Sequence, residues 1–344
     1  MNRLRCSYTK SASSAYSTFA RSSHNNSKHQ RGAALLLAML TVTLVATLAA
    51  SSLWQQWRSV EIEAAERQRV QSAWILTGAL DWARLILRED ARSGGADHLA
   101  EPWAVPLQEA RLSTFLAADP SNNADTSGAD NVFLSGEISD LQARMNVATL
   151  VQAGSVQTKS LENFQRLFDI LGLPQDQLAR MAENLRSASD ISVDNRNAAR
   201  APLMPQRLEQ LAWLGVAPET IAALGPYATV LPSASTKVNI NTATAEVLYA
   251  IGRNLSLADA KRLVVERERQ HFRNVADAIK LVQGAQFDLT QASVDTQYFE
   301  VRGRLRLEQV VIEERSVVQR IGPTVRTLQR ERGAFENFNQ AVVR

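Results

Sequence analysis

The chain has 344 residues, of which 45% are apolar and 21% are charged, a composition that predicts a folded protein of about two compact units. Its formal charge of +3 does not indicate a nucleic-acid partner, because six of its 38 Lys and Arg lie in residues 1–32, which hold no Asp or Glu. Subtracting these six leaves 32 basic against 35 acidic residues, a formal charge of −3. The only cysteine, Cys6, also lies in that stretch, which excludes disulfides and cysteine metal sites from the rest.

The N-terminal region predicts a polar leader followed by a membrane anchor. Residues 7–30 are rich in Ser, Asn, Thr, Lys and His and cannot bury enough apolar surface to become ordered. An apolar run follows at residues 33–54, and no charge lies between Arg31 and Arg58. Because about 20 helical residues cross the ~30 Å hydrocarbon layer, we assign a transmembrane helix to residues 33–57. The positive-inside rule places the leader in the cytoplasm and the C-terminal domain in the periplasm, for a single-pass protein of the inner membrane.

The possible cleavage signal, Gln30-Arg31-Gly32, precedes the apolar run, whereas a secretory signal peptide is cut after it. This arrangement resembles the type IV prepilin class, in which a membrane peptidase cleaves after Gly and methylates the new N-terminus. The resemblance implies cleavage after Gly32 by a prepilin peptidase and an N-methylated Ala33. The fifth mature residue is Leu37, where most pilins and pseudopilins carry Glu. Since an unpaired Glu in lipid costs roughly a few kcal/mol, Leu37 suits a subunit with no neighbour above it.

The anchor helix is expected to continue to about residue 90. Residues 58–90 contain no Pro and one Gly, and apolar side chains recur there at steps of three and four. These side chains are Val70, Ala73, Trp74, Thr77, Leu80, Ala83 and Leu87. Gly94-Gly95 should end the helix. Its first half would lie in lipid, and its second half would pack on a globular domain.

Two regions predict β-structure. Residues 132–150 are interpreted as two short strands across a turn at Ser135-Gly136, and residues 297–330 as further strands. Alternation in the second region places three arginines, Arg302, Arg304 and Arg306, on one face of a sheet. We favour a solvated sheet face for them, with an anion site or basic patch as the alternative.

Between these regions lies a helical stretch, residues 158–292, with a loose internal repeat. Three helical segments end at Gly172, Gly215 and Gly252, and each is followed by a polar or Pro-containing turn and another helix. Gly adopts the left-handed conformation at a helix C-terminus cheaply, and Ser or Pro begins the next helix. The pattern predicts helical hairpins of a SAM-like, all-α domain inserted into a pilin-like domain.

The fold class is therefore α+β: a long N-terminal helix packed on a small antiparallel sheet, with a large inserted helical domain. The expected parts are a cleaved leader at 1–32, the transmembrane helix at 33–57, the first part of the pilin-like domain at 58–157, the inserted domain at 158–292, the second part of the sheet at 293–335 and a C-terminal tail at 336–344.

Four segments together resemble the minor pseudopilin K (GspK) family of type II secretion systems. They are the strand from Asp140 to Asn146, Leu231-Pro232, the stretch VNINTATAEVLYAIG from Val238 onward, and Gln297-Tyr298-Phe299, in family order. The resemblance implies a non-enzymatic subunit that caps the tip of a periplasmic pseudopilus and helps to initiate its assembly for protein export across the outer membrane. Implied partners are minor pseudopilins I, J and H, the prepilin peptidase and the inner-membrane assembly platform, with no nucleic acid.

Two acidic stretches were considered as calcium sites. Residues 119–131 are rich in Asp and Asn but lack the spacing of an EF-hand, so a surface loop is favoured. The family also carries a calcium-associated acidic loop, for which the corresponding residues here are 183–194. Their two separated Asp and an Arg are a poor cage for a cation that takes six to eight oxygens. We therefore predict no calcium there and no cofactor.

The alternative function is a membrane-anchored helix–hairpin–helix protein that binds or takes up DNA. The Asn-x-Asn-Thr-Ala segment at 239–243 resembles such modules of competence proteins. The turn Gly252-Arg253-Asn254 has a single Gly, however, and phosphate binding without a net basic surface is weak. An enzyme is not expected, because His98 and His271, the histidines outside the leader, have no Cys nearby and no H-E-x-x-H pattern.

Overall fold

The computed structural model describes residues 30–117, 131–190, 192, 198–282, 284–307 and 310–333. The predicted leader up to residue 29, the polar loop at 119–130 and the C-terminal tail lie outside the described residues. The chain divides into two compact units, Met1–Gln68 and Arg69–Arg344, which are described separately below.

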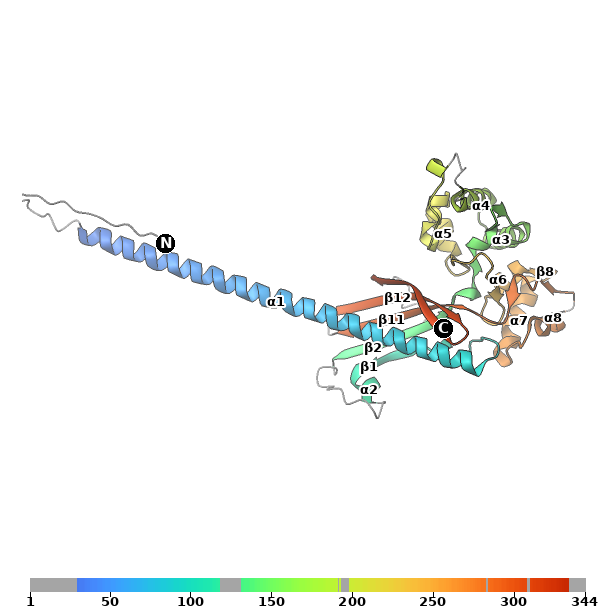
Figure 1. The fold of residues 1–344 in the computed structure, drawn as a ribbon, viewed down its shortest axis with the longest axis horizontal. Helices are drawn as coiled ribbons and strands as arrows, with labels where there is room; N and C mark the ends of the chain where they lie inside the picture. The colour runs from blue at the N-terminus through green and yellow to red at the C-terminus, as the bar shows by residue number, and fades with distance from the viewer. Residues whose placement is uncertain are drawn as a thin grey trace, which may run out of the picture. The chain divides into compact units, whose positions relative to one another are not determined.

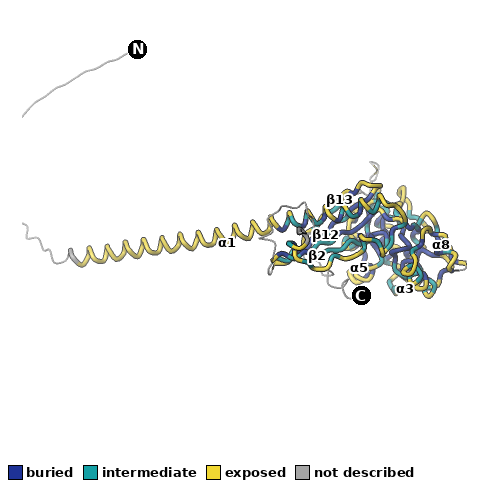
Figure 2. The backbone as a smooth tube through the Cα atoms, turned by 90° about the horizontal axis from the view of Figure 1, so that it is seen from below, coloured by how far each residue is buried: buried dark blue, intermediate teal, exposed yellow. Residues whose placement is uncertain are grey.

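The longest element is helix α1, Gln30–Ser93, which contributes to both units (Figure 1). Its predicted extent and its end at two glycines are confirmed, since Gly94 and Gly95 have φ of 65° and 118°. Residues 32–68 are all exposed, whereas α1 within the second unit alternates between buried and exposed positions (Figure 2).

The second unit contains a five-stranded antiparallel sheet of order β1-β2-β11-β12-β13. These strands are β1 Leu107–Arg111, β2 Val132–Asp140, β11 Tyr298–Leu307, β12 Val310–Ile321 and β13 Thr324–Gly333. Helix α1 packs on one face of this sheet, where Leu80 and Leu87 share a buried cluster with Phe299 and Val318. Leu76 joins a second cluster with residues of β2 and β11. The expected helix-on-sheet arrangement is thus confirmed.

The interpretation of residues 132–150 as two strands about a turn at Ser135-Gly136 was wrong. Strand β2 continues unbroken from Val132 to Asp140, and Gly136 pairs with Gly303 of β11. The glycine is needed for a close approach of two backbones, because a Cβ at Gly136 would lie 2.9 Å from the carbonyl oxygen of Arg302.

We expect Gly136→Ala to lower the free energy of unfolding of a fragment comprising residues 69–344 by about 1–3 kcal/mol, because the added methyl group must push two paired strands apart. Urea unfolding measures the change. Gly78→Ala is the matched control: its Cβ would meet nothing within 4 Å, and Ala is favoured over Gly in a helix by about 0.5–1 kcal/mol. Equal losses in the two variants would contradict the close approach at Gly136.

The rest of the second unit consists of short helices and two-residue strands. The α-helices are α2 Leu112–Ala117, α3 Thr158–Leu171, α4 Gln175–Ser189, α5 Pro218–Leu224, α6 Ala245–Ile251, α7 Leu257–Arg269 and α8 Val275–Leu281. The 3-10 turns are η1 Pro102–Ala104, η2 Leu141–Ala143, η3 Val147–Leu150, η4 Ala198–Arg200 and η5 Leu208–Leu214. The short strands are β3 Met145–Asn146, β4 Val151–Gln152, β5 Ser155–Val156, β6 Ala228–Thr229, β7 Val238–Asn239, β8 Gly252–Arg253, β9 Gln286–Phe287 and β10 Ala292–Ser293.

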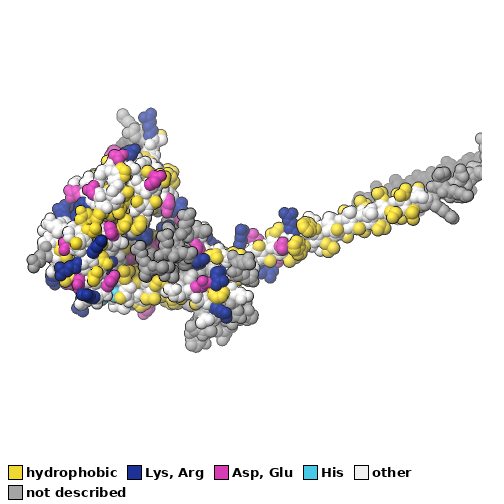
Figure 3. Space-filling view, turned by 180° about the vertical axis from the view of Figure 1, so that it is seen from behind, with side chains coloured by type: hydrophobic (Ala, Val, Ile, Leu, Met, Phe, Trp, Pro, Cys, Tyr) yellow, Lys and Arg dark blue, Asp and Glu magenta, His cyan; other side chains and the backbone are white. Residues whose placement is uncertain are grey.

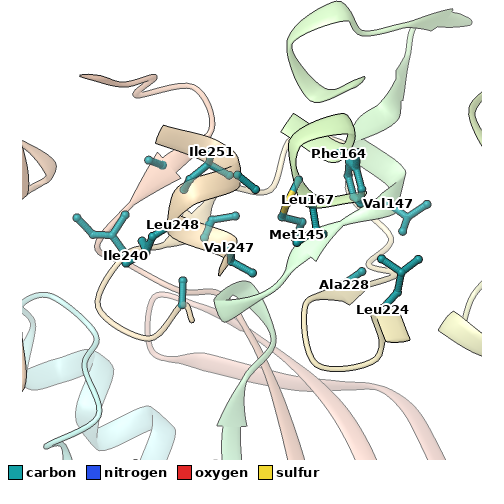
Figure 4. Packing of buried hydrophobic residues seen from close by; sticks show 14 of the residues in the cluster. Met145, Val147, Phe164, Leu167, Leu224, Ala228, Ile240, Val247, Leu248 and Ile251 are labelled. Carbon is teal, nitrogen blue, oxygen red and sulfur yellow. The ribbon is translucent and has the colours of Figure 1, made fainter. Parts of the chain in front are cut away.

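One hydrophobic cluster joins most of these elements, from β3 to β10, and extends from Met145 to Val294. Figure 4 shows Phe164 and Leu167 of α3 on one side of it and Val247, Leu248 and Ile251 of α6 on the other. The helical hairpins are present, and the short pairs β3–β6 and β7–β10, which the sequence did not predict, run between them.

The three repeat glycines have two different roles. Gly172 and Gly215 end α3 and η5 in the left-handed conformation, with φ of 65° and 81°. Gly252 follows α6 with φ −87°, and Asn254 has the positive φ of 53° instead. The expected left-handed cap at Gly252 was wrong: a Cβ there would lie 2.7 Å from the side chain of Leu255, so this glycine permits close packing.

Candidate assembly surface

The first unit presents an apolar helical surface. By length and composition, α1 contains one stretch able to cross a membrane. Four hydroxyls in it, those of Thr41, Thr43, Thr47 and Ser51, each donate to the backbone carbonyl three residues earlier at 2.8–2.9 Å. Each of these four hydroxyl hydrogens is thereby satisfied without water, which a hydrocarbon layer lacks. Figure 3 shows hydrophobic side chains along this rod, with charged groups farther toward its C-terminal part.

The predicted processing residues lie at the start of this helix. Gly32 and Ala33 are in its first turn, and Leu37, one turn later, is 64% exposed. Their exposure is compatible with access by a peptidase, and their processing roles stay predictions. Farther along, the rings of Trp54 and Trp57 contact each other at 5.8 Å between centroids, where the apolar run ends.

In the second unit, α1 is apolar on two opposite sides. Leu76, Leu80, Ala83 and Leu87 are buried against the sheet. The opposite side carries an exposed stripe, here called the outer face of α1, which consists of Val70, Trp74, Gly78, Trp82 and Leu85. Trp74 is 70% exposed and Leu85 is 49% exposed. Since large exposed apolar side chains that cluster mark interaction sites, the outer face of α1 is a candidate assembly surface.

The predicted apolar stripe merged these two sides. It placed Val70 and Trp74 together with Leu80 and Leu87 on one packing surface, and it omitted the buried Leu76. Steps of three and four fit both sides, so periodicity identified the helix but did not assign its faces. The wide apolar circumference, with Trp82 and Leu85 included, was the available indication that a second surface exists.

A buried ionic cluster fixes the chain just after α1. Side-chain oxygens of Asp90, Asp97 and Glu101 lie within 4.8 Å of one another, a grouping that could hold a cation. The guanidinium of Arg320 already binds Asp90 and Asp97, and it donates to the carbonyl oxygen of Thr296 at 3.0 Å. Burial raises the pKa of both aspartates, and Arg320 opposes that shift. The cluster is therefore a structural network in which an arginine supplies the positive charge.

A buried carboxylate, Asp140, ties the sheet to the helical segment. It lies at the end of β2 and accepts hydrogen bonds from the Thr242 hydroxyl at 2.6 Å and the Thr296 hydroxyl at 2.5 Å. The Asn239 amide at 3.0 Å and the backbone N–H of Gln142 at 2.6 Å complete the set. Burial raises the pKa of Asp140 to about 6, against the lowering effect of these four bonds. The network joins segments about 100 and 156 positions away from Asp140 along the chain.

The three arginines of β11 lie on one face of the sheet, as predicted, and each has an acidic partner. Arg302 binds Glu300 at 2.6 Å, Arg304 lies 3.6 Å from Glu313, and Arg306 binds Glu109 at 2.5 Å. The face is therefore an ion-pair ladder rather than a bare basic patch. In the proposed DNA-binding turn, Arg253 pairs with Glu162 at 2.9 Å, so its charge is already matched.

Comparisons with known proteins agree on one family. Two family models, both described as type II secretion system protein K, match residues 143–233 and 238–302. The type II secretion system protein K of Pseudomonas aeruginosa is 27% identical over 302 residues, covering 81% of this chain and 85% of that protein. These matches support the predicted resemblance to minor pseudopilin K of type II secretion systems.

Further relatives extend the match over nearly the whole length. Protein K of Pectobacterium carotovorum is 25% identical over 90% of this chain and 98% of that protein. The GspK-GspI-GspJ complex from enterotoxigenic Escherichia coli contains a chain of similar fold, with a TM-score of 0.59 and 19% identity over 79% of this chain and 99% of that one. The predicted α+β pilin-like fold and the predicted family are thereby confirmed. The family is a structural pseudopilin family of secretion and is not known for catalysis.

Proposed function

We propose that the chain is a non-enzymatic minor pseudopilin that lies at the tip of the periplasmic pseudopilus and helps to initiate its assembly. The observation that carries this proposal is the outer face of α1, an exposed apolar stripe on the helix that follows a membrane-spanning segment. Pseudopilins I and J are the proposed partners, because the similar chain was solved in a complex with GspI and GspJ. Pseudopilin H, the prepilin peptidase and the inner-membrane assembly platform complete the proposed set, as the resemblance implies.

The chemistry of the outer face supports a helical partner. Trp74, Gly78 and Trp82 follow one another at four-residue steps, so the small Gly78 lies between two large rings. A Cβ at Gly78 would meet nothing within 4 Å, which leaves a depression on the helix surface. A ridge of side chains from a neighbouring helix fits such a depression, as in ridge-into-groove packing.

The tip position rests on Leu37 and on the membrane topology. With Leu at the fifth mature position, the subunit has no carboxylate there to pair with the N-terminus of a subunit above it. We propose that the leader is cytoplasmic, that cleavage after Gly32 exposes Ala33 for methylation, and that residues 69–344 lie in the periplasm. We propose domain boundaries as predicted from the sequence, with the helical segment at 158–292 as an insertion. The absence of calcium at residues 183–194 also stays a prediction, because residues 191 and 193–197 lie outside the described part of the chain.

Trp74→Asp should weaken association with pseudopilins I and J at least about 30-fold. An aromatic side chain at the centre of an interface contributes about 2 kcal/mol or more, and an Asp there would have to be desolvated without a partner. The full chain is co-expressed with the prepilin peptidase and pseudopilins I and J, and co-purification in detergent measures the complex. Mass spectrometry of the same sample should find N-methyl-Ala33.

Leu289→Asp serves as the matched control, because Leu289 is 63% exposed but lies outside α1. It should leave the complex intact. Unchanged co-purification of Trp74→Asp would refute the outer face as the docking surface, and a retained leader would refute the pilin-type processing.

A further inference from the structure

The face of the sheet opposite α1 contributes to a polar cavity of about 570 Å³. Val301 and Val318 point toward α1, so the alternating neighbours Arg302 and Arg315 project into the other side. The cavity is also lined by η5, by the residues just after α5, and by Arg144 between η2 and β3. None of these basic side chains has a role in the proposed docking of α1.

The strand register places two like charges opposite each other. Arg302 of β11 pairs with Arg315 of β12, and the row continues to Glu137 on one side and to Glu331 on the other. Like charges directly across a sheet repel. Glu300, whose side chain is fully buried, relieves this repulsion by accepting the Nε–H groups of Arg302 at 2.6 Å and Arg315 at 2.5 Å. Each carboxylate oxygen of Glu300 thus accepts one Nε–H group, and the terminal NH₂ groups of the two arginines do not bind Glu300.

Arg144 adds a third guanidinium to the same cavity. Among the described residues its side chain forms no hydrogen bond or ion pair, although Glu300 and, more weakly, Asp140 attract it electrostatically. Glu137 is attracted by the same guanidinium. Burial lowers the pKa of Arg144, and repulsion from Arg302 and Arg315 contributes. Its N–H donors are not among the buried unsatisfied atoms of the described residues, so solvent reaches them and they are available to an acceptor that arrives from outside.

The remaining charges of the cavity do not supply that acceptor. Arg207 and Glu331 pair with each other at 3.0 Å, and Glu209, the other acid that lines the cavity, forms no ion pair within the described part of the chain. Glu137, outside the lining, lies 3.7 Å from Arg302. The cavity also has apolar walls, formed by Leu141, Leu208, Pro226, Val230 and Val317. Its size and its mixed lining exceed what a single inorganic ion requires and suit a short stretch of peptide.

We propose that this cavity is a binding site for a carboxylate of a partner protein, an Asp or Glu side chain or a C-terminal carboxylate, held by Arg144 with Arg302 and Arg315. Arginine matches the planar carboxylate with two parallel N–H···O bonds, and the partly buried setting strengthens such charge-assisted bonds. Apolar atoms of the entering segment pack against the cavity walls. The site does not depend on the outer face of α1, so either proposal can fail without the other.

The test uses the full chain in detergent and two blocked peptides, acetyl-Gly-Glu-Glu-Gly-amide and its Gln-Gln counterpart. Isothermal titration at low salt should detect binding of the Glu peptide and at least about tenfold weaker binding of the Gln peptide, with the Glu affinity falling as salt is raised. Equal binding of the two peptides, or binding of neither, would overturn the proposal. Tighter binding of inorganic phosphate than of the Glu peptide would also overturn it, in favour of a free oxyanion.

Arg144→Met tests the residue assignment. It should weaken binding of the Glu peptide at least about tenfold. Thermal stability should be unchanged or higher, because the burial of this charge and its repulsion by Arg302 and Arg315 oppose its attraction to Glu300. Arg253→Met is the matched control: its guanidinium pairs with Glu162 outside the cavity, so peptide affinity should change less than threefold. A larger loss in Arg253→Met than in Arg144→Met would move the site away from Arg144. The two-peptide comparison on the unaltered chain remains decisive whether or not a variant folds.

Discussion

Replacement of Arg320 by Ala should lower the free energy of unfolding of the fragment 69–344 by about 3–5 kcal/mol. The side chains of Arg320, Asp90 and Asp97 are each at least 91% buried, as their exposed fractions are 9%, 9% and 5%. Removing one partner of a buried ion pair leaves charges that water no longer solvates, which costs about 3–5 kcal/mol. The loss of the guanidinium also removes the contact with the Phe299 ring, 4.8 Å from its centroid. Urea unfolding at pH 7 measures the effect.

The cause can be separated from a general loss of packing. In Arg320→Ala the remaining carboxylates should bind protons more tightly, so the deficit should shrink as pH falls toward 4. Arg92→Ala, near the end of α1, serves as the control. It removes the ion pair with Glu89, whose two side chains are 59% and 69% exposed, and should change stability by less than about 0.5 kcal/mol. A deficit of similar size at pH 4 and pH 7 would contradict the unpaired-charge explanation.

Asp140 should make the stability of the second unit depend on pH by about 3 kcal/mol. Its pKa is raised from 3.8 to about 6 in the folded chain, so the folded state binds this proton more tightly than the unfolded state does. The resulting stabilisation is fully present below pH 3.8 and is lost as pH rises through 6, mostly between pH 4 and 6.5. Asp140→Asn removes this contribution, so the stability difference between the two proteins should narrow by about 3 kcal/mol from pH 3.5 to 7.

Other groups titrate in the same pH range, so the effect of Asp140 is obtained from the difference in stability between the unaltered protein and Asp140→Asn. Glu300, paired with two arginines, has a lowered pKa and loses its contribution as pH falls, in the opposite sense. Asp288→Asn is the control, since Lys159 and Thr290 hold the pKa of Asp288 well below its usual range. Its stability difference from the unaltered protein should widen as pH rises from 3 to 5. A pH-independent difference for Asp140→Asn would show that folding leaves the proton affinity of Asp140 unchanged, and it would contradict the prediction.

Local patterns in the sequence were sufficient for the main elements. The run without charge between Arg31 and Arg58, the apolar steps beyond it and Gly94-Gly95 predict α1 with its ends. Alternation predicts β11 to β13, because side chains of a strand point to opposite faces in turn. Gly172 and Gly215 predict two helix ends, because only the backbone of the residue itself is involved. The family resemblance followed from short motifs in order along the chain.

Contacts between distant segments could not be obtained in this way. Gly136 was assigned to a turn because the carbonyl group that makes a glycine necessary there belongs to Arg302. The sequence did not show that Arg302 lies opposite Arg315 or that both bind Glu300. Which residues lie opposite each other depends on how β11 pairs with β12. In the sequence, Asp140 was identified only as part of a family motif. Its role in the fold was not visible, because its three side-chain donors come from two remote segments.

The sequence by itself therefore determined that this chain has an apolar N-terminal helix, a strand region of alternating charge and a helical segment between β regions, because each depends on the spacing of neighbouring residues. Only the tertiary structure decided which side of α1 packs on the sheet and which side remains exposed for a partner. It also decided that Arg320 pairs with two aspartates at the end of α1, whereas the Arg144 side chain forms no ion pair among the described residues. Burial and pairing are properties of residues brought together from separate parts of the chain, and no local pattern encodes them.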